Sequence, residues 1–285
     1  MKIVKILGGL GNQMFQYAFY LSLCRRYKVV KVETGDFDTY DLHNGLELEK
    51  IFNIKLDRVA PFMAKLYDSN NRTWAFRKLR RMMNLKHAYY QEPSLFKLDY
   101  NVFIDSRPMI YWGYWQNENY FKDIANVIRE KFSFKEPIDK KNTETYSLIA
   151  NCNSVSIHIR RGDYIGHELL GGICDLAYYQ KAIDLIHNRI DHPHFFIFSN
   201  DIDWCQENLK VSHSTFISWN SGKESYKDMQ LMALCKHNII ANSSFSWWGA
   251  WLNENPDKIV ITPKVWTNNP IDKDSFSVPQ NWIAL

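Results

Sequence analysis

The second half of the chain alternates short apolar segments with longer amphipathic ones. The short segments are rich in Val, Ile and Phe, as buried strands are, and the longer ones carry apolar residues at helical spacing. Strands that alternate with helices form a parallel, doubly wound sheet with right-handed crossovers. We therefore predict an α/β fold. The predicted strands are 155–160, 195–198, 215–218, 238–241 and 258–261, and the predicted helices are 177–190, 202–209, 223–236 and 247–254.

The strand predicted at 155–160 carries a group of polar side chains. Apolar and polar residues alternate along it, and the Gly and Asp that follow must end it. His158, Arg160, Arg161 and Asp163 then lie at the carboxyl end of a strand, where open α/β sheets bind ligands. Two guanidinium groups at this edge favour an anion such as a diphosphate. The alternative is an ordinary surface strand with solvated Arg side chains.

A second polar segment, 242–246, separates the strand predicted at 238–241 from the next helix. The hydroxyls of Ser243 and Ser244 would cap this helix, and its free N–H groups would also bind phosphate. Asp228, on the preceding helix, is expected near the same edge. Its carboxylate could accept hydrogen bonds from a guanine base, or it is a solvated helix acid.

The first half begins like a nucleotide-binding fold. A strand at 2–7, a glycine-rich loop and a helix at 13–26 resemble the G-x-G-x-x-G pattern, but Met14 stands at the third glycine position. Glu33 would end the next strand, where dinucleotide-binding folds place a ribose-binding acid. An NAD(P)-dependent oxidoreductase is therefore an alternative hypothesis.

Composition limits the remaining possibilities. A chain of 285 residues with 46% hydrophobic residues can form two domains, and the polar segment 136–142 is the best linker. The predicted domains are 1–138 and 139–285. Charges of 35 basic and 31 acidic residues do not indicate a large nucleic-acid surface. Five cysteines without CxxC spacing, and no signal peptide or membrane span, favour a reduced cytoplasmic setting.

Three further segments leave alternatives open. The basic segment 72–90 predicts an amphipathic helix, which is either an ordinary solvated helix or a contact for anionic membrane lipid or a lipid-linked acceptor. The aromatic strand at 110–116 is core or the wall of a sugar site. Asp36 and Asp38 have the spacing of a metal-binding D-x-D but fit a solvated turn, so we predict no metal.

Three motifs together resemble the signature of the bacterial α-1,2-fucosyltransferases, of the glycosyltransferase family 11 type. They are the segments 8–18, 158–164 and 241–248, and the segments 113–116 and 261–263 are similar to further parts of that family. The resemblance implies an inverting, metal-independent enzyme with two Rossmann-like domains facing a cleft, the GT-B arrangement. It would transfer L-fucose from GDP-fucose to the 2-hydroxyl of a terminal β-galactoside, free or lipid-linked, in the synthesis of surface glycans such as O-antigen.

The resemblance also implies roles for particular residues. The C-terminal domain would hold GDP-fucose, and the N-terminal domain would face the acceptor. Asp163 or Glu168 would be the base, unless the reaction needs little base help, and the loop 166–172 is long enough to act as a lid. A non-catalytic sugar-binding protein remains an alternative. The residues implied to bind the donor are His158, Arg160 and Arg161 at the diphosphate, Asn200 and Asp228 at the nucleoside, Ser243, Ser244 and Phe245 at the phosphate-binding turn, and Gly11 and Asn12 in the N-terminal loop.

Overall fold

The chain forms two compact units, each built around its own parallel sheet. The computed structural model describes residues 1–39, 43–135, 139–276 and 278–285, and the units are Met1–Ser133 and Phe134–Leu285. Part of the predicted linker, 136–138, lies outside the described residues. The remainder is helical instead, because the Asp139 carboxylate accepts a hydrogen bond from the backbone N–H of Asn142 and so caps α7 (Lys140–Ala150).

The first unit has a four-stranded sheet in the order β2-β1-β4-β3, with every pairing parallel. The glycine-rich loop joins β1 to α1, as predicted. The strands are β1 (Lys2–Lys5), β2 (Val30–Glu33), β3 (Tyr89–Gln91) and β4 (Met109–Trp112). The helices are α1 (Leu10–Cys24), α2 (Leu48–Ile51), α3 (Pro61–Tyr67), α4 (Trp74–Met82), α5 (Asn101–Ile104) and α6 (Ala125–Lys131), with 3₁₀ turns η1 (Gly35–Asp38), η2 (Glu118–Tyr120) and η3 (Lys122–Ile124).

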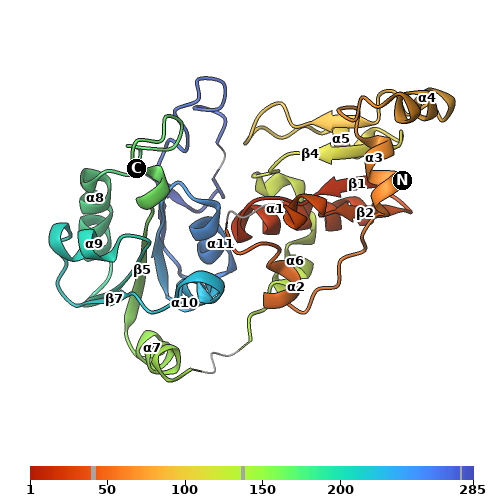
Figure 1. Ribbon diagram of the computed structural model, residues 1–285. Helices are drawn as coiled ribbons and strands as arrows, with labels where there is room; N and C mark the ends of the chain where they lie inside the picture. Colours follow the sequence, from red (N-terminus) through yellow and green to blue (C-terminus); the bar gives the residue numbers. More distant parts are fainter. Residues whose placement is uncertain (40–42, 136–138, 277) are drawn as a thin grey trace. The chain divides into compact units, whose positions relative to one another are not determined.

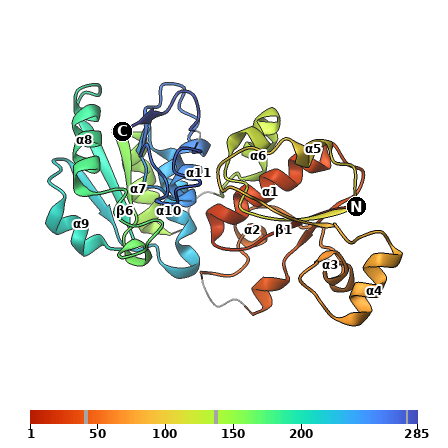
Figure 2. The same ribbon diagram turned by 90° about the horizontal axis from the view of Figure 1, so that it is seen from above.

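Aromatic side chains fill the core between α1 and the sheet of the first unit. The ring of Phe19 stacks on that of Trp115 with the centroids 4.1 Å apart, and meets Tyr111 edge to face at 5.5 Å. Ile3 and Ile110 instead pack with buried residues of α3 and with Leu85. Figure 2 shows α3 and α4 lying together, in orange. Both sides of this short sheet are therefore covered.

The single helix predicted at 72–90 is wrong, because α4 ends at Met82 and β3 follows it. Asn84 adopts a left-handed conformation with φ 54°, and the N–H of Leu85 donates to the carbonyl of Arg80 at 2.8 Å. This is the capping pattern that ends helices at Gly or Asn. The helical spacing of apolar residues over 120–134 also predicts one continuous helix, which is wrong, because this segment is divided into 3₁₀ turns and α6.

The second unit confirms the predicted alternation of strands and helices. Its six strands are all parallel, in the order β10-β9-β8-β5-β6-β7. The strands are β5 (Asn153–Ile159), β6 (Pro193–Ser199), β7 (Ser214–Ile217), β8 (His237–Ile239), β9 (Val260–Thr262) and β10 (Ile283–Ala284). The helices after α7 are α8 (Leu176–His187), α9 (Ile202–Asn208), α10 (Tyr226–Leu234) and α11 (Ser244–Leu252), with 3₁₀ turns η4 (Gly162–Tyr164) and η5 (Gly222–Glu224).

Helices cover both faces of this sheet. In Figures 1 and 2, α8 and α9 lie on one face and α10 and α11 on the other. The core under α8 includes Ile157, Ile183 and Phe195, each at most 2% exposed. The central strand β5 is buried along almost its whole length, so its last residues emerge at the carboxyl edge of the sheet. No helix among the described residues is long and apolar enough to cross a bilayer.

Candidate functional site

Arg160 leaves the end of β5 and is held by Asp163. Its Nε lies 2.8 Å from Oδ1 of Asp163, and its Nη2 donates to Oδ2 at 2.9 Å. The carboxylate therefore binds one edge of the guanidinium in a bidentate manner and fixes its plane. The other edge, with Nη1, points away from this pair. The side chain of Arg160 is 28% exposed, so this cation is accessible to a ligand.

Arg161 is held by residues that follow the next strand of the sheet, β6. Its Nε donates to Oδ2 of Asp201 at 3.0 Å, and its guanidinium carbon lies 3.8 Å from the centre of the Trp204 ring. Asn200 accepts a hydrogen bond from the Arg161 backbone N–H at 3.0 Å. A Cβ on Gly162 would lie 2.3 Å from Nδ2 of Asn200, so a side chain here would displace the Asn200 amide. Asn200 therefore holds the turn that positions both arginines.

His158 precedes this turn and is buried at the end of β5. It is 5% exposed, and its Nδ1 has no hydrogen-bond partner among the described residues. Burial, together with the nearby charge of Arg160, lowers the pKa of His158 to about 3. The imidazole is therefore neutral at physiological pH. Its ring lies 5.7 Å from that of Phe245, at the start of α11.

The beginning of α11 is the second polar group at this edge. Ser243 accepts a hydrogen bond from the Phe245 backbone N–H at 3.3 Å and caps the helix. Ser244 and Phe245 are partly exposed, and no acid occupies the first turn of the helix. Tyr164 donates to the carbonyl of Asn242 at 3.2 Å and joins the turn after β5 to this segment. A helix N-terminus beside two arginines is a site for an anion.

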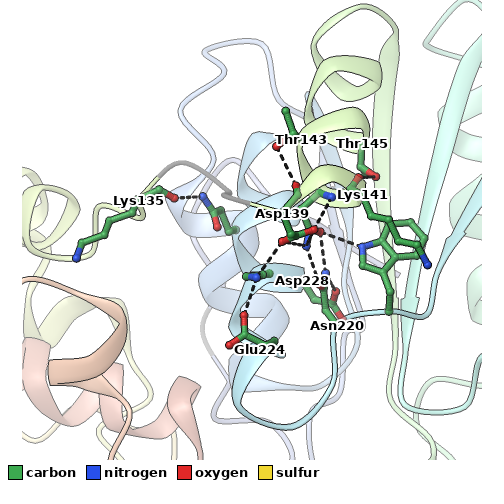
Figure 3. Close-up of polar contacts among 12 residues, drawn as sticks. Lys135, Asp139, Lys141, Thr143, Thr145, Asn220, Glu224 and Asp228 are labelled. Atoms are coloured by element: carbon green, nitrogen blue, oxygen red, sulfur yellow. Dashed lines mark hydrogen bonds and ion pairs between the residues drawn. The ribbon is translucent and has the colours of Figure 1, made fainter.

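Asp228 lies in the first turn of α10, within a hydrogen-bonded network (Figure 3). One carboxylate oxygen accepts a hydrogen bond from Asn220 at 2.8 Å, and burial raises the pKa of Asp228 to about 7. Asn220 exchanges two further hydrogen bonds with Asn142 of α7. Near it, Lys227 bridges the carboxylates of Asp139 and Glu224. Hydrogen bonds therefore hold Asp228 in place, and its protonated and ionised forms are both populated at neutral pH.

Glu168 lies in the loop after η4, and this loop is tied to the rest of its unit. The carbonyl of Leu169 accepts hydrogen bonds from the backbone N–H of Asn268 at 2.8 Å and from the hydroxyl of Thr267 at 3.1 Å. Asn242 donates to the carbonyl of Leu170. The loop is thus hydrogen-bonded to two other segments of its unit, and its role as a lid stays a prediction. The Glu168 residue itself is exposed.

Gly11 and Asn12 belong to the first unit, in the first turn of α1. Asn12 accepts a hydrogen bond from Gln116 at 2.8 Å. Two buried glutamines of α1 hold the loops around them. Gln13 donates to the carbonyls of Gly8 and Gly45, and Gln16 donates to that of Gly113. This polar loop lies at the carboxyl edge of the first sheet.

The aromatic segment 110–116 divides into buried and accessible residues. Tyr111 and Trp115 are core residues, 1% and 0% exposed, whereas Trp112 and Tyr114 are partly exposed, with ring centroids 6.1 Å apart. Glu92 accepts hydrogen bonds from the backbone N–H groups of Tyr114 and Trp115, and Trp115 has φ 57°. Tyr111 and Trp115 therefore belong to the core, whereas for Trp112 and Tyr114 the wall of a sugar site stays a prediction.

Metal ligands do not cluster in the part of the chain that the structure describes. No group of three or more His, Cys, Asp and Glu side chains is arranged to hold an ion there. Of the D-x-D pair, Asp36 forms an ion pair with Lys5 at 2.9 Å.

The residue pattern of both units matches one family of enzymes from end to end. The model of Glycosyl transferase family 11 matches residues 1–285. The chain belongs to this family. This membership confirms the resemblance to family 11 glycosyltransferases that the sequence motifs indicated. The match gives no support to the oxidoreductase hypothesis.

Curated relatives of this family 11 chain act in bacterial polysaccharide synthesis and on galactosides, by their names. An "Alpha-1,2-colitosyltransferase" of Escherichia coli is 34% identical over 99% of this chain and 98% of its own. The "O-antigen biosynthesis glycosyltransferase WbnK" of Escherichia coli is 32% identical, with 98% of each chain covered. "Galactoside alpha-(1,2)-fucosyltransferase 1" of Bos taurus is 28% identical over 86% of this chain and 64% of its own.

A solved structure supports the predicted fold class. The α-1,6-fucosyltransferase NodZ, soaked with GDP-fucose, aligns with a TM-score of 0.51 at 14% sequence identity, over 88% of this chain and 92% of that one. The family 11 chain therefore has the GT-B-like fold, with an α/β unit in each half.

Several supporting residues of the site were not predicted from the sequence. Gln13 and Gln16 shape the loop of the first unit, Glu92 holds the turn after β4, and Asp201 holds Arg161. The two glutamines had a visible signal, because they are polar residues on buried positions of an otherwise apolar helix. Asp201 had one too, as the N-cap of α9 directly after a strand. Glu92 had none, because its partners are backbone N–H groups of a distant segment.

Proposed function

We propose that this family 11 chain transfers L-fucose from GDP-fucose to the 2-hydroxyl of a terminal β-galactoside, with inversion at the fucose C1, in the synthesis of O-antigen-like glycan. The observation that carries the proposal is the family membership of the whole chain, together with the cationic edge of the second unit. The names of the relatives support the α-1,2 linkage. The free cysteines suit a cytoplasmic enzyme.

The donor would bind at the carboxyl edge of the second sheet. Arg160 offers the second edge of its guanidinium to the diphosphate, and the N-terminus of α11 adds the positive end of the helix dipole. Arg161 adds positive charge while Asp201 and Trp204 hold it. The neutral His158 adds a hydrogen-bonding nitrogen without a charge that would need balancing.

These groups suit the chemistry of sugar transfer. Breaking the bond between C1 of fucose and the phosphate oxygen leaves positive character on the sugar and added negative charge on GDP. Preorganised donors that face this developing charge lower the barrier, and each is worth on the order of 10²–10³ in rate. We therefore propose that guanidinium groups and a helix N-terminus stabilise the departing GDP, with no metal required.

The nucleoside would contact Asp228. An ionised carboxylate can accept two N–H groups from the edge of a guanine base, whereas adenine presents no matching pair. Since the pKa of Asp228 is raised to about 7, two donated hydrogen bonds would favour its ionised form. Asn220 and Asn142 hold the carboxylate in place. Asn200, which the family resemblance places near the ribose, also holds the turn at Arg161.

The acceptor would be bound by the first unit. Trp112 and Tyr114 offer partly exposed rings, and aromatic faces stack on the apolar face of galactose. Gln116 offers its amide group to the sugar hydroxyls, and it donates a hydrogen bond to Asn12 at 2.8 Å, a residue that the family resemblance assigns to the donor. We assign the acceptor to this unit on that chemistry, and the donor to the other.

The two candidate bases differ in their surroundings. Asp163 already binds Arg160 through both oxygens, which suits a positioning residue. Glu168 is exposed and its loop is hydrogen-bonded in place, which leaves its carboxylate available to take the proton of the acceptor hydroxyl.

The experiment that tests the proposal is an assay of GDP release and product structure. GDP-fucose is offered with lactose, with an array of β-galactosides and with matched 2-deoxygalactosides. We expect α-1,2-fucosylated product, none from the 2-deoxy acceptors, and full activity in EDTA. Glycan binding without turnover would instead favour a non-catalytic sugar-binding protein, and loss of activity in EDTA would contradict metal independence.

A second donor is favoured by one observation, the 34% identity to the colitosyltransferase. Colitose is fucose without its 3-hydroxyl, so GDP-colitose carries the same diphosphate and guanine. The two sugars are distinguished by comparing kcat/KM for both donors with one acceptor. A site that hydrogen-bonds the 3-hydroxyl rejects the deoxy analogue strongly, and a higher kcat/KM for GDP-colitose would make colitose the transferred sugar.

A further inference from the structure

The outer face of α4 is unusually rich in exposed aromatic, methionine and basic side chains. It lies in the first unit, beside α3 (Figures 1 and 2). We call the following exposed residues the α4 surface: Phe62, Arg72, Trp74, Arg77, Lys78, Arg81, Met82, Met83 and Lys86.

The fold fixes which side of α4 faces outward. Phe76 and Leu79 pack against the cluster that contains Leu66 and Ile3. Arg80 is 5% exposed and donates hydrogen bonds to the carbonyls of Lys65, Asp68 and Asn71, at the end of α3 and in the loop after it. Apolar packing and a buried arginine therefore hold the inner side. Phe62 of α3 adds to this attachment from the margin of the α4 surface, since its ring centroid lies 5.5 Å from that of Phe76.

The outward residues form two parallel rows along the helix. Trp74, Lys78 and Met82 follow one another at a spacing of four, so they lie on one line. Trp74 and Met82 are each 74% exposed, and the Lys78 ammonium lies 5.2 Å from the centre of the Trp74 ring. Arg77 and Arg81 form the adjacent row. Apolar and cationic side chains thus point outward together.

The charge of this region has one sign. From residue 69 to residue 91 the chain contains no acidic residue. The preceding acid, Asp68, is partly buried and accepts a hydrogen bond from the backbone of Asn70. The cations of the α4 surface are therefore not balanced by acids of their own segment.

We infer that the α4 surface binds the surface of an anionic phospholipid bilayer. Lys and Arg side chains would contact the phosphates and other anionic headgroups, and Trp74 and Met82 would insert at the level where headgroups meet acyl chains. Nucleic acid offers phosphates but no apolar layer for Met82 and Met83, so the exposed apolar row favours a bilayer. This binding is independent of the reaction proposed above.

The experiment is sedimentation of the full chain with phospholipid vesicles. Vesicles of phosphatidylcholine alone are compared with vesicles that also contain phosphatidylglycerol. We expect binding to the anionic vesicles that weakens as salt increases. The triple variant Arg77→Glu, Lys78→Glu, Arg81→Glu should lose on the order of 100-fold in affinity, since each basic residue contributes roughly a factor of five.

Matched variants keep the inference falsifiable. Lys181→Glu, Arg189→Glu, Lys210→Glu makes the same change in net charge at exposed positions of the second unit, and it should bind vesicles like wild type. Trp74→Ser, Met82→Ser should bind anionic vesicles more weakly than wild type. All three variants should retain wild-type circular dichroism and activity on a soluble acceptor.

Three results would overturn the inference. They are equal binding of wild type to both kinds of vesicle, retention of binding by the Arg77, Lys78, Arg81 variant, and equal losses in the matched control. A surface that binds single-stranded or duplex RNA but not anionic vesicles would be a nucleic-acid site instead.

Discussion

At the scale of single residues, the chemistry of the proposed donor site depends on where each guanidinium is already bound. Arg160 is bound to Asp163 along one edge, whereas Arg161 is bound to Asp201 and covered by Trp204. Arg160 is therefore the better candidate for direct contact with the diphosphate, and Arg161 contributes charge from a fixed place. Substitution of each residue tests a different role.

Arg160→Ala should abolish transfer while the protein remains folded. We expect kcat to fall on the order of 10²–10³, because a fixed donor to the departing phosphate is lost. The measurement is steady-state kinetics with GDP-fucose, with Arg189→Ala, an exposed arginine of the same unit, as control. Near-normal turnover of Arg160→Ala would refute the contact.

Asp163→Asn and Glu168→Gln should separate positioning from base catalysis. Asp163→Asn loosens the plane of Arg160 and should raise the KM for the donor. Glu168→Gln removes the proposed base and should lower kcat on the order of 10²-fold with unchanged donor KM. Acceptor kinetics at several pH values measure both. If neither variant loses more than about tenfold in kcat, base catalysis by either residue is unsupported.

His158→Gln should make stability less sensitive to acid. The pKa of His158 is about 3 in the folded protein, against an ordinary value of 6.5. Between these values the unfolded chain binds a proton that the folded protein does not, so the free energy of unfolding falls as pH falls from 6.5 toward 3. The glutamine variant lacks this loss. Urea unfolding at pH 7 and pH 4.5 measures the difference, with the exposed His87 changed to Gln as control. An equal fall in the free energy of unfolding between these pH values for wild type and His158→Gln would contradict the burial argument.

At the scale of elements, the turn from β5 into η4 decides the geometry of the site. Its shape depends on contact between the backbone of Gly162 and the amide of Asn200, which follows β6. Two neighbouring parallel strands thus fix one turn together. A side chain at residue 162 would push the Asn200 amide away from this turn.

Gly162→Ala should displace the Asn200 amide and weaken donor binding. Its Cβ would lie 2.3 Å from Nδ2, so the hydrogen bond to the Arg161 N–H breaks, at a cost of about 1 kcal/mol in the free energy of unfolding. We also expect a higher KM for GDP-fucose. Thermal unfolding and kinetics are measured for Gly162→Ala, Asn200→Ala and the double variant. The double variant should lose little more than either single one, whereas additive losses would show that the two residues act separately.

Periodicity predicted most elements of the second unit because its buried strands and amphipathic helices differ clearly in pattern. It failed where a single residue changed the backbone. Asn84 ends α4 through a left-handed conformation, and the segment after it becomes the edge strand β3 rather than more helix. At the site, residues delivered by strand ends, such as Arg160 and Ser243, were predictable from local pattern. Glu92 and the tie between Leu169 and Asn268 depend on distant partners and were not.

At the scale of the whole molecule, the two units each have a sheet and a core of their own. Cationic and helix-end groups that suit a diphosphate gather in the second unit, and amide and aromatic groups that suit a sugar gather in the first. Under the proposed function, each substrate would therefore bind to its own unit. The division also predicts which unit is stabilised when one ligand binds alone.

GDP alone should protect the second unit most strongly in hydrogen exchange. We expect slower exchange of amides in 158–164 and 243–248, because a ligand that binds only the folded state suppresses local opening. The same experiment on Arg160→Ala should show little protection. Protection centred on 8–18 instead would place the nucleotide on the first unit and contradict the assignment.

The ion pair between Arg160 and Asp163 has a consequence for what can replace the arginine. A guanidinium is planar and has two edges that carry N–H donors. One edge can therefore bind a carboxylate of the protein while the second, already oriented, faces a ligand. An ammonium at the same place is a single point charge, and it would pair with Asp163. Lysine would therefore preserve the net charge at this position, but its ammonium would be occupied by Asp163 and would not be available to bind the nucleotide.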